Sequence, residues 1–245
     1  MIDKEFTSRN RKIINKMDKD IELKKLSQKW FDKSFEHEYS YHFTWLGLPI
    51  IQYPQDIIAL QEIIWKIKPD LIIETGIARG GSLIFYASML ELLQKGEVIG
   101  IDIDIRKHNK KAIESHPLNK RITMIEGSSI KKDIIKKVFK LSQNKKKILV
   151  ILDSFHTHSH VLKELEAYSE LVSKGGCIVV FDTVVEDMPK NSFPNKPWSI
   201  GNNPKTAVKE FLTKNNRFKI DKTIEKEILI TSCKNGFLKC VKNIS

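Results

Sequence analysis

The sequence of 245 residues predicts an α/β fold, in which a doubly wound, mostly parallel sheet ends in an antiparallel hairpin and follows N-terminal helices. Two observations favour this fold. From residue 70 onward, apolar runs of strand length alternate with segments of helical periodicity, as in strands that helices cover on both faces. Near the end, Asn235-Gly236 separates two apolar runs, which is a strong short-range signal of a hairpin.

The N-terminal part of the chain has a different pattern. Residues 3–33 are polar, with apolar residues at helical spacing, and predict one or two amphipathic helices. Residues 36–54 are irregular and aromatic, and Pro54 opens a predicted helix over 54–67. We therefore expect an N-terminal helical and aromatic extension, residues 1–55, and a main domain, residues 56–245.

In the main domain, the predicted elements alternate in order. The strands are expected at 70–74, 97–103, 121–126, 147–152 and 176–182, and the helices at about 81–94, 106–115, 129–142 and 158–172. A helix at about 204–215 then precedes two hairpin strands, 227–233 and 237–241. A parallel sheet with such an end is the arrangement of class I methyltransferases, which bind S-adenosylmethionine (SAM). A Rossmann domain for NAD has no reason to end this way.

Composition and charge narrow the function classes. Hydrophobic residues make up 41% of the chain, enough for a core, and the apolar runs are far shorter than the ~20 residues of a membrane span. The charged N-terminus does not resemble a secretory signal, and the three cysteines form no disulfide framework, so we expect a cytoplasmic protein. We also expect it to be a homo-oligomer.

The net charge of +12 raises the question of nucleic-acid binding. Much of the excess lies in residues 131–147, where eight lysines accompany one aspartate, Asp133. Arginine, the residue best suited to bidentate phosphate contacts, is rare. We therefore expect a solvated helix face and no nucleic-acid partner, with a patch for an anionic partner as the alternative.

A glycine-rich turn follows the first strand of the main domain. The sequence from Glu74 through Gly76 to Gly80 and Gly81 has the spacing acid-x-Gly-x-x-x-Gly, which is neither the dinucleotide motif nor a P-loop. Gly76 would let the backbone approach an adenosyl group, and the helix start at Gly80 to Ser82 would face the methionine carboxylate. Glu74 would hold turn amides or the ammonium of the ligand. A plain tight turn remains the alternative.

The next two strands end in further candidate cofactor contacts. Asp102 and Asp104 alternate with isoleucine at the end of the second strand, and either carboxylate could accept the ribose hydroxyls, with Asp102 preferred. Gly127, Ser128 and Ser129 follow the third strand, where an adenine would lie. For the serines the alternative is an N-cap of the lysine-rich helix.

The fourth and fifth strands deliver Asp153 and Asp182 to the same edge of the sheet. Converging carboxylates need a counter-charge, and Mg²⁺ meets this need with oxygen ligands. Such an ion would lower the pKa of an acceptor hydroxyl. His156 is the candidate general base, with packing at the strand end as the alternative.

Two other histidines and a long loop accompany this edge. His160 lies one helical turn from His156, so a zinc site with Asp153 is an alternative, whereas His158 is expected to be solvated. The loop 186–203, which contains Trp198, is long and proline-rich and is interpreted as a substrate lid.

Several of these segments together resemble the cephalosporin hydroxylase family over roughly residues 30–241. The matching segments are 41–52, 54–56, 69–76, 152–154 with His156 and 160–161, and 207–212. The resemblance implies a SAM-dependent O-methyltransferase for antibiotics, sugars or cell-surface glycans. It also implies a magnesium site built from an aspartate after the fourth strand and an acidic pair after the fifth.

Two residues depart from the family pattern. Phe155 and Phe181 stand where the family usually has acids, while Asp153 and Asp182 carry over. Glu186 and Asp187 are candidates to replace the missing acid. The expected function is O-methylation of a small molecule or sugar with help from Mg²⁺. The alternatives are a SAM-binding protein without metal catalysis and an NAD-linked oxidoreductase.

Overall fold

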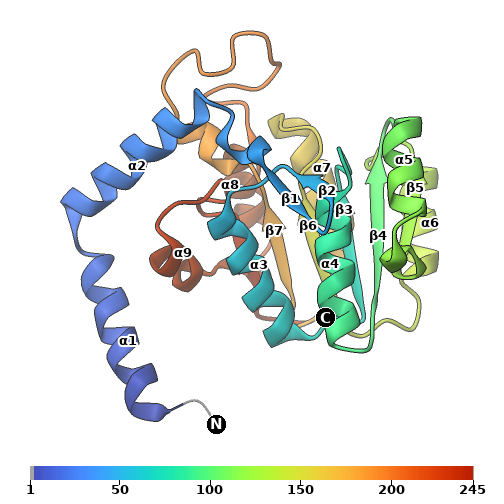
Figure 1. The fold of residues 1–245 in the computed structure, drawn as a ribbon, viewed down its shortest axis with the longest axis horizontal. Coiled ribbons are helices and arrows are strands. Elements are labelled where there is room, and N and C mark those ends of the chain that lie inside the picture. Colours follow the sequence, from blue (N-terminus) through green and yellow to red (C-terminus); the bar gives the residue numbers. More distant parts are fainter. Residues whose placement is uncertain (1–2, 245) are drawn as a thin grey trace.

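Seven apolar strands form one twisted sheet in the computed structural model, which describes residues 3–244 (Figure 1). The sheet order is β5-β4-β3-β6-β7-β9-β8. The strands are β3 (Leu71–Thr75), β4 (Glu97–Asp102), β5 (Ile122–Glu126), β6 (Ile148–Leu152), β7 (Cys177–Val180), β8 (Phe218–Ile220) and β9 (Phe237–Cys240). The first five are parallel, as predicted, and β9 pairs antiparallel with both β7 and β8.

Helices cover both faces of the sheet because its strands are apolar on both sides. The helices α3 (Pro54–Ile67), α4 (Gly81–Leu92) and α5 (Lys107–Glu114) pack on one face. The helices α6 (Lys132–Leu141), α7 (His158–Tyr168) and α8 (Pro204–Lys214) pack on the other. The central strand β3 shows the reason, since Ile72 lies in the first core and Leu71 and Ile73 lie in the second. The predicted doubly wound architecture is confirmed.

In the lysine-rich segment, residues 131–147, the apolar side of α6 faces the sheet and the lysines face the solvent. Ile134 and Val138 of α6 are buried against the sheet. The side chains of most lysines in residues 131–147 are exposed, and Lys145 pairs with Glu97 at 3.0 Å.

The antiparallel end of the sheet differs from the predicted hairpin. Residues 227–233 are not a strand; they contain the end of α9 (Lys222–Ile228) and a loop, and the antiparallel partner of β9 is β8. Tertiary hydrogen bonds explain this, because the N–H of Ser232 donates to Asp56 and its carbonyl accepts from the N–H of Val184. Gly236 is required by close approach to β7, since a Cβ there would lie 2.2 Å from the carbonyl oxygen of Val180.

The N-terminal segment contains two helices, as predicted, and a small hairpin that was not predicted. The helices are α1 (Lys4–Met17) and α2 (Ile21–Phe35), which form an arm beside α9 (Figure 1). The hairpin pairs β1 (Phe43–Trp45) with β2 (Leu48–Ile50) through Leu46 and Gly47, both at positive φ. Its strand β2 touches the start of α4, where a Cβ at Gly81 would lie 2.3 Å from the carbonyl oxygen of Pro49.

The boundary between residues 1–55 and 56–245 stays a prediction. None of the helices within residues 3–244 combines the length and the apolar character that crossing a membrane requires.

Candidate active site

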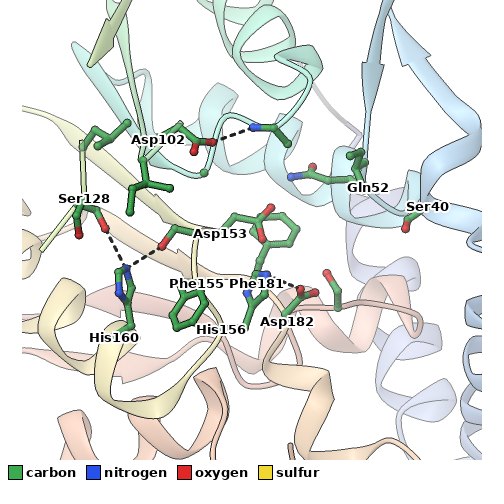
Figure 2. A pocket seen from close by; sticks show the side chains of 18 of the residues that line it. Ser40, Gln52, Asp102, Ser128, Asp153, Phe155, His156, His160, Phe181 and Asp182 are labelled. Atoms are coloured by element: carbon green, nitrogen blue, oxygen red, sulfur yellow. Dashed lines mark hydrogen bonds and ion pairs between the residues drawn. The ribbon is translucent and has the colours of Figure 1, made fainter. Parts of the chain in front are cut away.

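A cavity of about 550 Å³ lies at the carboxyl edge of the parallel strands (Figure 2). Eight of the predicted site residues line it: Gly76, Asp102, Gly127, Ser128, Ser129, Asp153, His156 and Asp182. Four do not line it: Glu74, Gly80, Ser82 and Asp104. The strand register explains the grouping, because Thr75 pairs with Leu152 and the chain therefore leaves β3 and β6 side by side at Gly76 and Asp153.

Asp102 holds the glycine turn through backbone hydrogen bonds. Its Oδ2 accepts from the N–H groups of Ile77 at 2.8 Å and Ala78 at 3.2 Å, and its Oδ1 accepts from the N–H of Asp104 at 3.2 Å. Of the two alternatives for Glu74, that it holds the turn amides is wrong, because these amides bind Asp102. Asp104 is exposed outside the cavity, so the preference for Asp102 at the cavity wall agrees with the geometry.

Glu74 lies beneath the cavity rather than in its wall. Its side chain is fully buried and accepts from the hydroxyls of Ser82 at 2.7 Å and Tyr86 at 2.9 Å. Burial raises the pKa of Glu74 to about 8, although both hydroxyls act in the opposite direction. At pH 7 the carboxyl group of Glu74 is therefore mostly protonated.

The two glycines at the start of α4 serve packing. A Cβ at Gly80 would lie 2.5 Å from the side chain of Ile113 in α5, and Gly81 lies against β2. The absence of a side chain at these positions therefore lets α5 and β2 approach the start of α4.

Ser129 and Ser154 belong to a buried polar cluster around Glu164. Their hydroxyls donate to Oε1 of Glu164 at 2.5 and 2.7 Å. Nε2 of His160 lies 3.1 Å from Ser129 Oγ and 3.2 Å from Ser154 Oγ. The alternative that the serines cap α6 is excluded, because the N-cap of α6 is Lys131 and has no side-chain cap bond.

The structure separates the three histidines. His156 precedes α7, and its Nε2 lies 3.3 Å from Oδ2 of Asp182. His160 belongs to the cluster around Glu164, so the alternative zinc site with His156 is not formed. His158, expected to be solvated, is half-buried and bonds Thr206 at 2.8 Å and Glu210 at 2.9 Å in α8.

Asp153, His156 and Asp182 form the one candidate metal group found among residues 3–244. One ligand atom from each lies within 4.8 Å of the others. The pKa of Asp153 is raised well above its usual range, first by burial and then by the negative charges of Asp182 and Glu74. A cation would relieve this repulsion, and two carboxylates are suitable oxygen donors, so Asp153 and Asp182 fit a divalent ion.

The aromatic residues at the family's acid positions have different surroundings. Phe155 is 45% exposed at the cavity, and its ring contacts Trp198 with centroids 5.7 Å apart. Phe181 is buried in the first core and also lines the cavity. Trp198, from the predicted lid, also contacts His156 with centroids 4.8 Å apart. The loop therefore reaches the imidazole edge of the cavity.

Glu186 and Asp187 do not replace the missing acid, because both are engaged elsewhere. Glu186 accepts from the N–H of Gly201 at 2.8 Å and from the side chain of Asn203. Asp187 pairs with Lys205 and with Lys234. These contacts fix the two ends of the loop and the start of α8.

Sequence reasoning missed the N-terminal contribution to the cavity. Ser40, Tyr41, Gln52 and Tyr53 line it, although they precede the main domain, and Ser232 contributes from the C-terminal loop. Gln52 is 4% exposed, and its Oε1 has no hydrogen-bond partner among the described residues. The available signals were the aromatic, irregular character of residues 36–54 and the family resemblance of residues 41–52.

Comparisons with known proteins agree with this fold. A family model described as Rhamnosyl O-methyltransferase/CmcI matches residues 37–241. Two relatives named rhamnosyl O-methyltransferase are each 30% identical. The one from Mycobacterium leprae aligns over 80% of this chain and 82% of the relative, and the one from Mycobacterium tuberculosis (strain ATCC 25618 / H37Rv) over 80% and 77%.

Solved structures are similar at lower identity. A structure of CmcI with Mg and SAM has a TM-score of 0.57 at 18% identity, covering 82% of this chain and 77% of that one. MycE methyltransferase in complex with Mg, S-adenosylhomocysteine (SAH) and mycinamycin VI has a TM-score of 0.52 at 15% identity. It covers 87% of this chain and 54% of the MycE chain. At these identities the similarity supports the fold.

Proposed function

The chain belongs to the Rhamnosyl O-methyltransferase/CmcI family, and on this premise we propose that it transfers the methyl group of SAM to a hydroxyl of a sugar or another small molecule. One observation carries the proposal. A single cavity joins the glycine turn and Asp102 to the group of Asp153, His156 and Asp182. The first part suits a nucleoside with an amino-acid tail, and the second suits an acceptor hydroxyl that must lose a proton.

The cofactor would lie along the carboxyl edge of the strands. Gly76 lines the cavity where the adenosyl group would lie, and Asp102 would offer acceptor capacity to the ribose hydroxyls beside the turn amides. Gly127, Ser128 and Ser129 would flank the adenine. Glu74 and Ser82 are hydrogen-bonded to each other. Glu74 would affect the methionine end of the cofactor through its charge, and Ser82 would hold Glu74 in position.

Asp153 and Asp182 would hold a divalent cation, with Mg²⁺ as the expected ion. Their carboxylates converge within the candidate metal group. When bound, such an ion lowers the pKa of an acceptor hydroxyl.

His156 would accept the proton of the acceptor hydroxyl. Its Nε2 lies beside Oδ2 of Asp182, which stabilises the imidazolium that forms. SAM, when bound, would supply the methyl group: the acceptor oxygen would bond to the methyl carbon, and the electron pair of the broken carbon–sulfur bond would remain on the sulfur of SAH. Trp198 packs against His156, and Phe155 packs against Trp198, so the two aromatic rings would reduce the access of water to the imidazole.

A methyl-transfer assay tests the proposal. Isotopically labelled SAM would be incubated with purified protein and a panel of rhamnosides, other glycosides and hydroxylated small molecules. Mass spectrometry should show the gain of one methyl group on an acceptor oxygen together with SAH. His156→Ala should lose this transfer while it retains SAH binding. Binding of NAD without binding of SAH would contradict the proposal.

The proposal extends to setting and assembly. We expect a cytoplasmic homo-oligomer with no nucleic-acid partner. Exposed apolar side chains on the N-terminal arm support association, among them Phe6 at 56% and Ile21 at 70% exposure. Sedimentation velocity measures the oligomeric state.

A further inference from the structure

Gln52 is a buried side chain with an unsatisfied acceptor in the wall of the active-site cavity (Figure 2). It lies between β2 and α3, and only 4% of it is exposed. A buried carbonyl oxygen without a donor is costly, so its persistence needs an explanation in terms of a ligand.

The amide group of Gln52 is held from two directions. It lies close to Asp153 and Tyr86 and acts against the burial that raises the pKa of each. Tyr86 in turn donates to Glu74 at 2.9 Å. These contacts occupy the amide and leave Oε1 with no donor among the described residues.

The charges around Gln52 select a cation as that donor. Asp153 and Asp182 line the same cavity as Gln52, so the charged side chains nearest to it there are carboxylates. A neutral hydroxyl would donate to Oε1 without adding positive charge, whereas an ammonium group would both donate to Oε1 and offset part of the negative charge of the cavity. SAM and SAH carry one such group, on the α-carbon of the amino-acid end.

We propose that Oε1 of Gln52 binds the α-ammonium group of the cofactor, so that a residue outside the α/β sheet recognises its amino-acid end. This inference rests on the proposed function, since it takes SAM as the cofactor. It gives the segment before α3 a direct binding role. The contact also brings an ammonium to the region between Glu74 and Asp153.

Calorimetry with two ligands and two glutamine variants tests the inference. The ligands are SAH and its desamino analogue, which lacks only the α-amino group. In Gln52→Leu, SAH should bind about tenfold more weakly, as expected for one lost charge-assisted hydrogen bond, and affinity for the analogue should be unchanged. Gln52→Glu keeps an acceptor oxygen and should bind SAH more tightly than Gln52→Leu.

Gln55→Leu is the matched control. Gln55 also has a buried Oε1 without a partner among the described residues, but it does not line the cavity, so SAH affinity should stay at the wild-type level. Equal weakening of both ligands in Gln52→Leu, or no weakening of SAH, overturns the inference.

The wild-type protein provides a second measurement that does not depend on the folding of a variant. It should bind SAH at least about tenfold more tightly than the desamino analogue, and equal affinities overturn the inference. If the wild type binds neither ligand, the proposed function itself fails. If both ligands bind and the glutamine effect is absent, only the role of Gln52 fails.

Discussion

The hydroxyls of Ser129 and Ser154, which follow the non-adjacent strands β5 and β6, donate to the same carboxylate oxygen, Oε1 of Glu164. Both serines line the cavity, and Ser154 directly follows Asp153. Glu164 is fully buried on α7, and its Oε2 has no partner among the described residues. The carboxylate of Glu164 thus connects the segment after β5, which is expected to contact adenine, to the loop after β6 that carries Asp153.

Glu164→Gln should weaken this connection. A glutamine keeps one acceptor oxygen but loses the negative charge that strengthens both hydrogen bonds, so we expect a loss of about 1–3 kcal/mol in the free energy of unfolding. SAH affinity and methyl-transfer rate should both fall, because both loops shift. Urea denaturation and calorimetry measure these effects. Glu166→Gln is the control, since Glu166 lies exposed on the same helix; an equal effect there would remove the special role of Glu164.

Asp102→Asn should reduce cofactor affinity through the ribose. The oxygen that remains can still accept from the turn amides of Ile77 and Ala78, but the charge and one acceptor oxygen are lost. Each lost charge-assisted hydrogen bond costs about 1.5–3 kcal/mol, so SAH and adenosine should both bind roughly tenfold or more weakly. Asp104→Asn, at an exposed position, should change neither affinity. If Asp104→Asn alone weakens binding, the ribose contact belongs to Asp104.

Cofactor binding should release a proton from Glu74. The pKa of Glu74 is about 8 without ligand, so the group is mostly protonated at pH 7. The positive charges of SAM favour the carboxylate and lower this pKa, so the proton leaves on binding. SAM affinity should therefore rise between about pH 6 and 8 and level off above that.

The measurement compares binding enthalpies at pH 7 in buffers with different ionisation enthalpies. Glu74→Gln should abolish the buffer dependence that the wild type shows. Proton uptake on binding, or a wild-type affinity that falls with rising pH, would be incompatible with this assignment.

Gly76→Ala should destabilise the edge that carries the site. Gly76 has φ +93, and a Cβ there would lie 2.0 Å from the carbonyl oxygen of Asp153. Left-handed strain costs about 1–2 kcal/mol and forced overpacking about 1–3 kcal/mol more. Gly175→Ala is the matched control, because Gly175 has φ +88 and open space around it. Urea denaturation should show only the strain cost in the control, and equal losses would mean that the close approach does not matter.

The parallel part of the fold could be predicted because the local sequence pattern of each strand matches its burial in the folded sheet. Strands buried on both faces must be apolar throughout, and polar residues that end such strands must meet at one edge, which is where Asp102, Asp153 and Asp182 lie. The first hairpin strand was misplaced because Ser232 is held by Asp56, far away in sequence. No local period encodes such a bond.

The same limit explains the site residues that sequence reasoning missed or misassigned. Gln52 reaches the cavity because β2 packs against the start of α4, a contact between segments without shared periodicity. Glu186 was a reasonable substitute for a missing acid by position, but its carboxylate turns to Gly201 and Asn203. Backbone donors in a loop compete for carboxylates, and spacing alone does not show which partner is bound.

Removal of divalent ions should stop methyl transfer and leave cofactor binding largely intact. Asp153 and Asp182 converge on the cavity, and the charge of Asp182 helps to raise the pKa of Asp153. A cation bound between the two carboxylates would relieve their repulsion. With Phe155 and Phe181 at the positions of family acids, the site has fewer charges, and Mg²⁺ binding should be weak. A chelator should therefore abolish turnover, and added Mg²⁺ should restore it.

Three variants separate the metal from the imidazole. Asp153→Asn should lose cation binding, measured by calorimetry with Mg²⁺ alone, and should retain SAH binding. Phe155→Asp adds a carboxylate at an exposed position of the cavity wall and should bind Mg²⁺ several-fold more tightly. His156→Ala should retain cation binding and lose transfer. Full turnover in chelator would show that the cation is dispensable. If His156→Ala then lost that turnover, transfer would depend on proton removal by the imidazole, which lies beside Asp182.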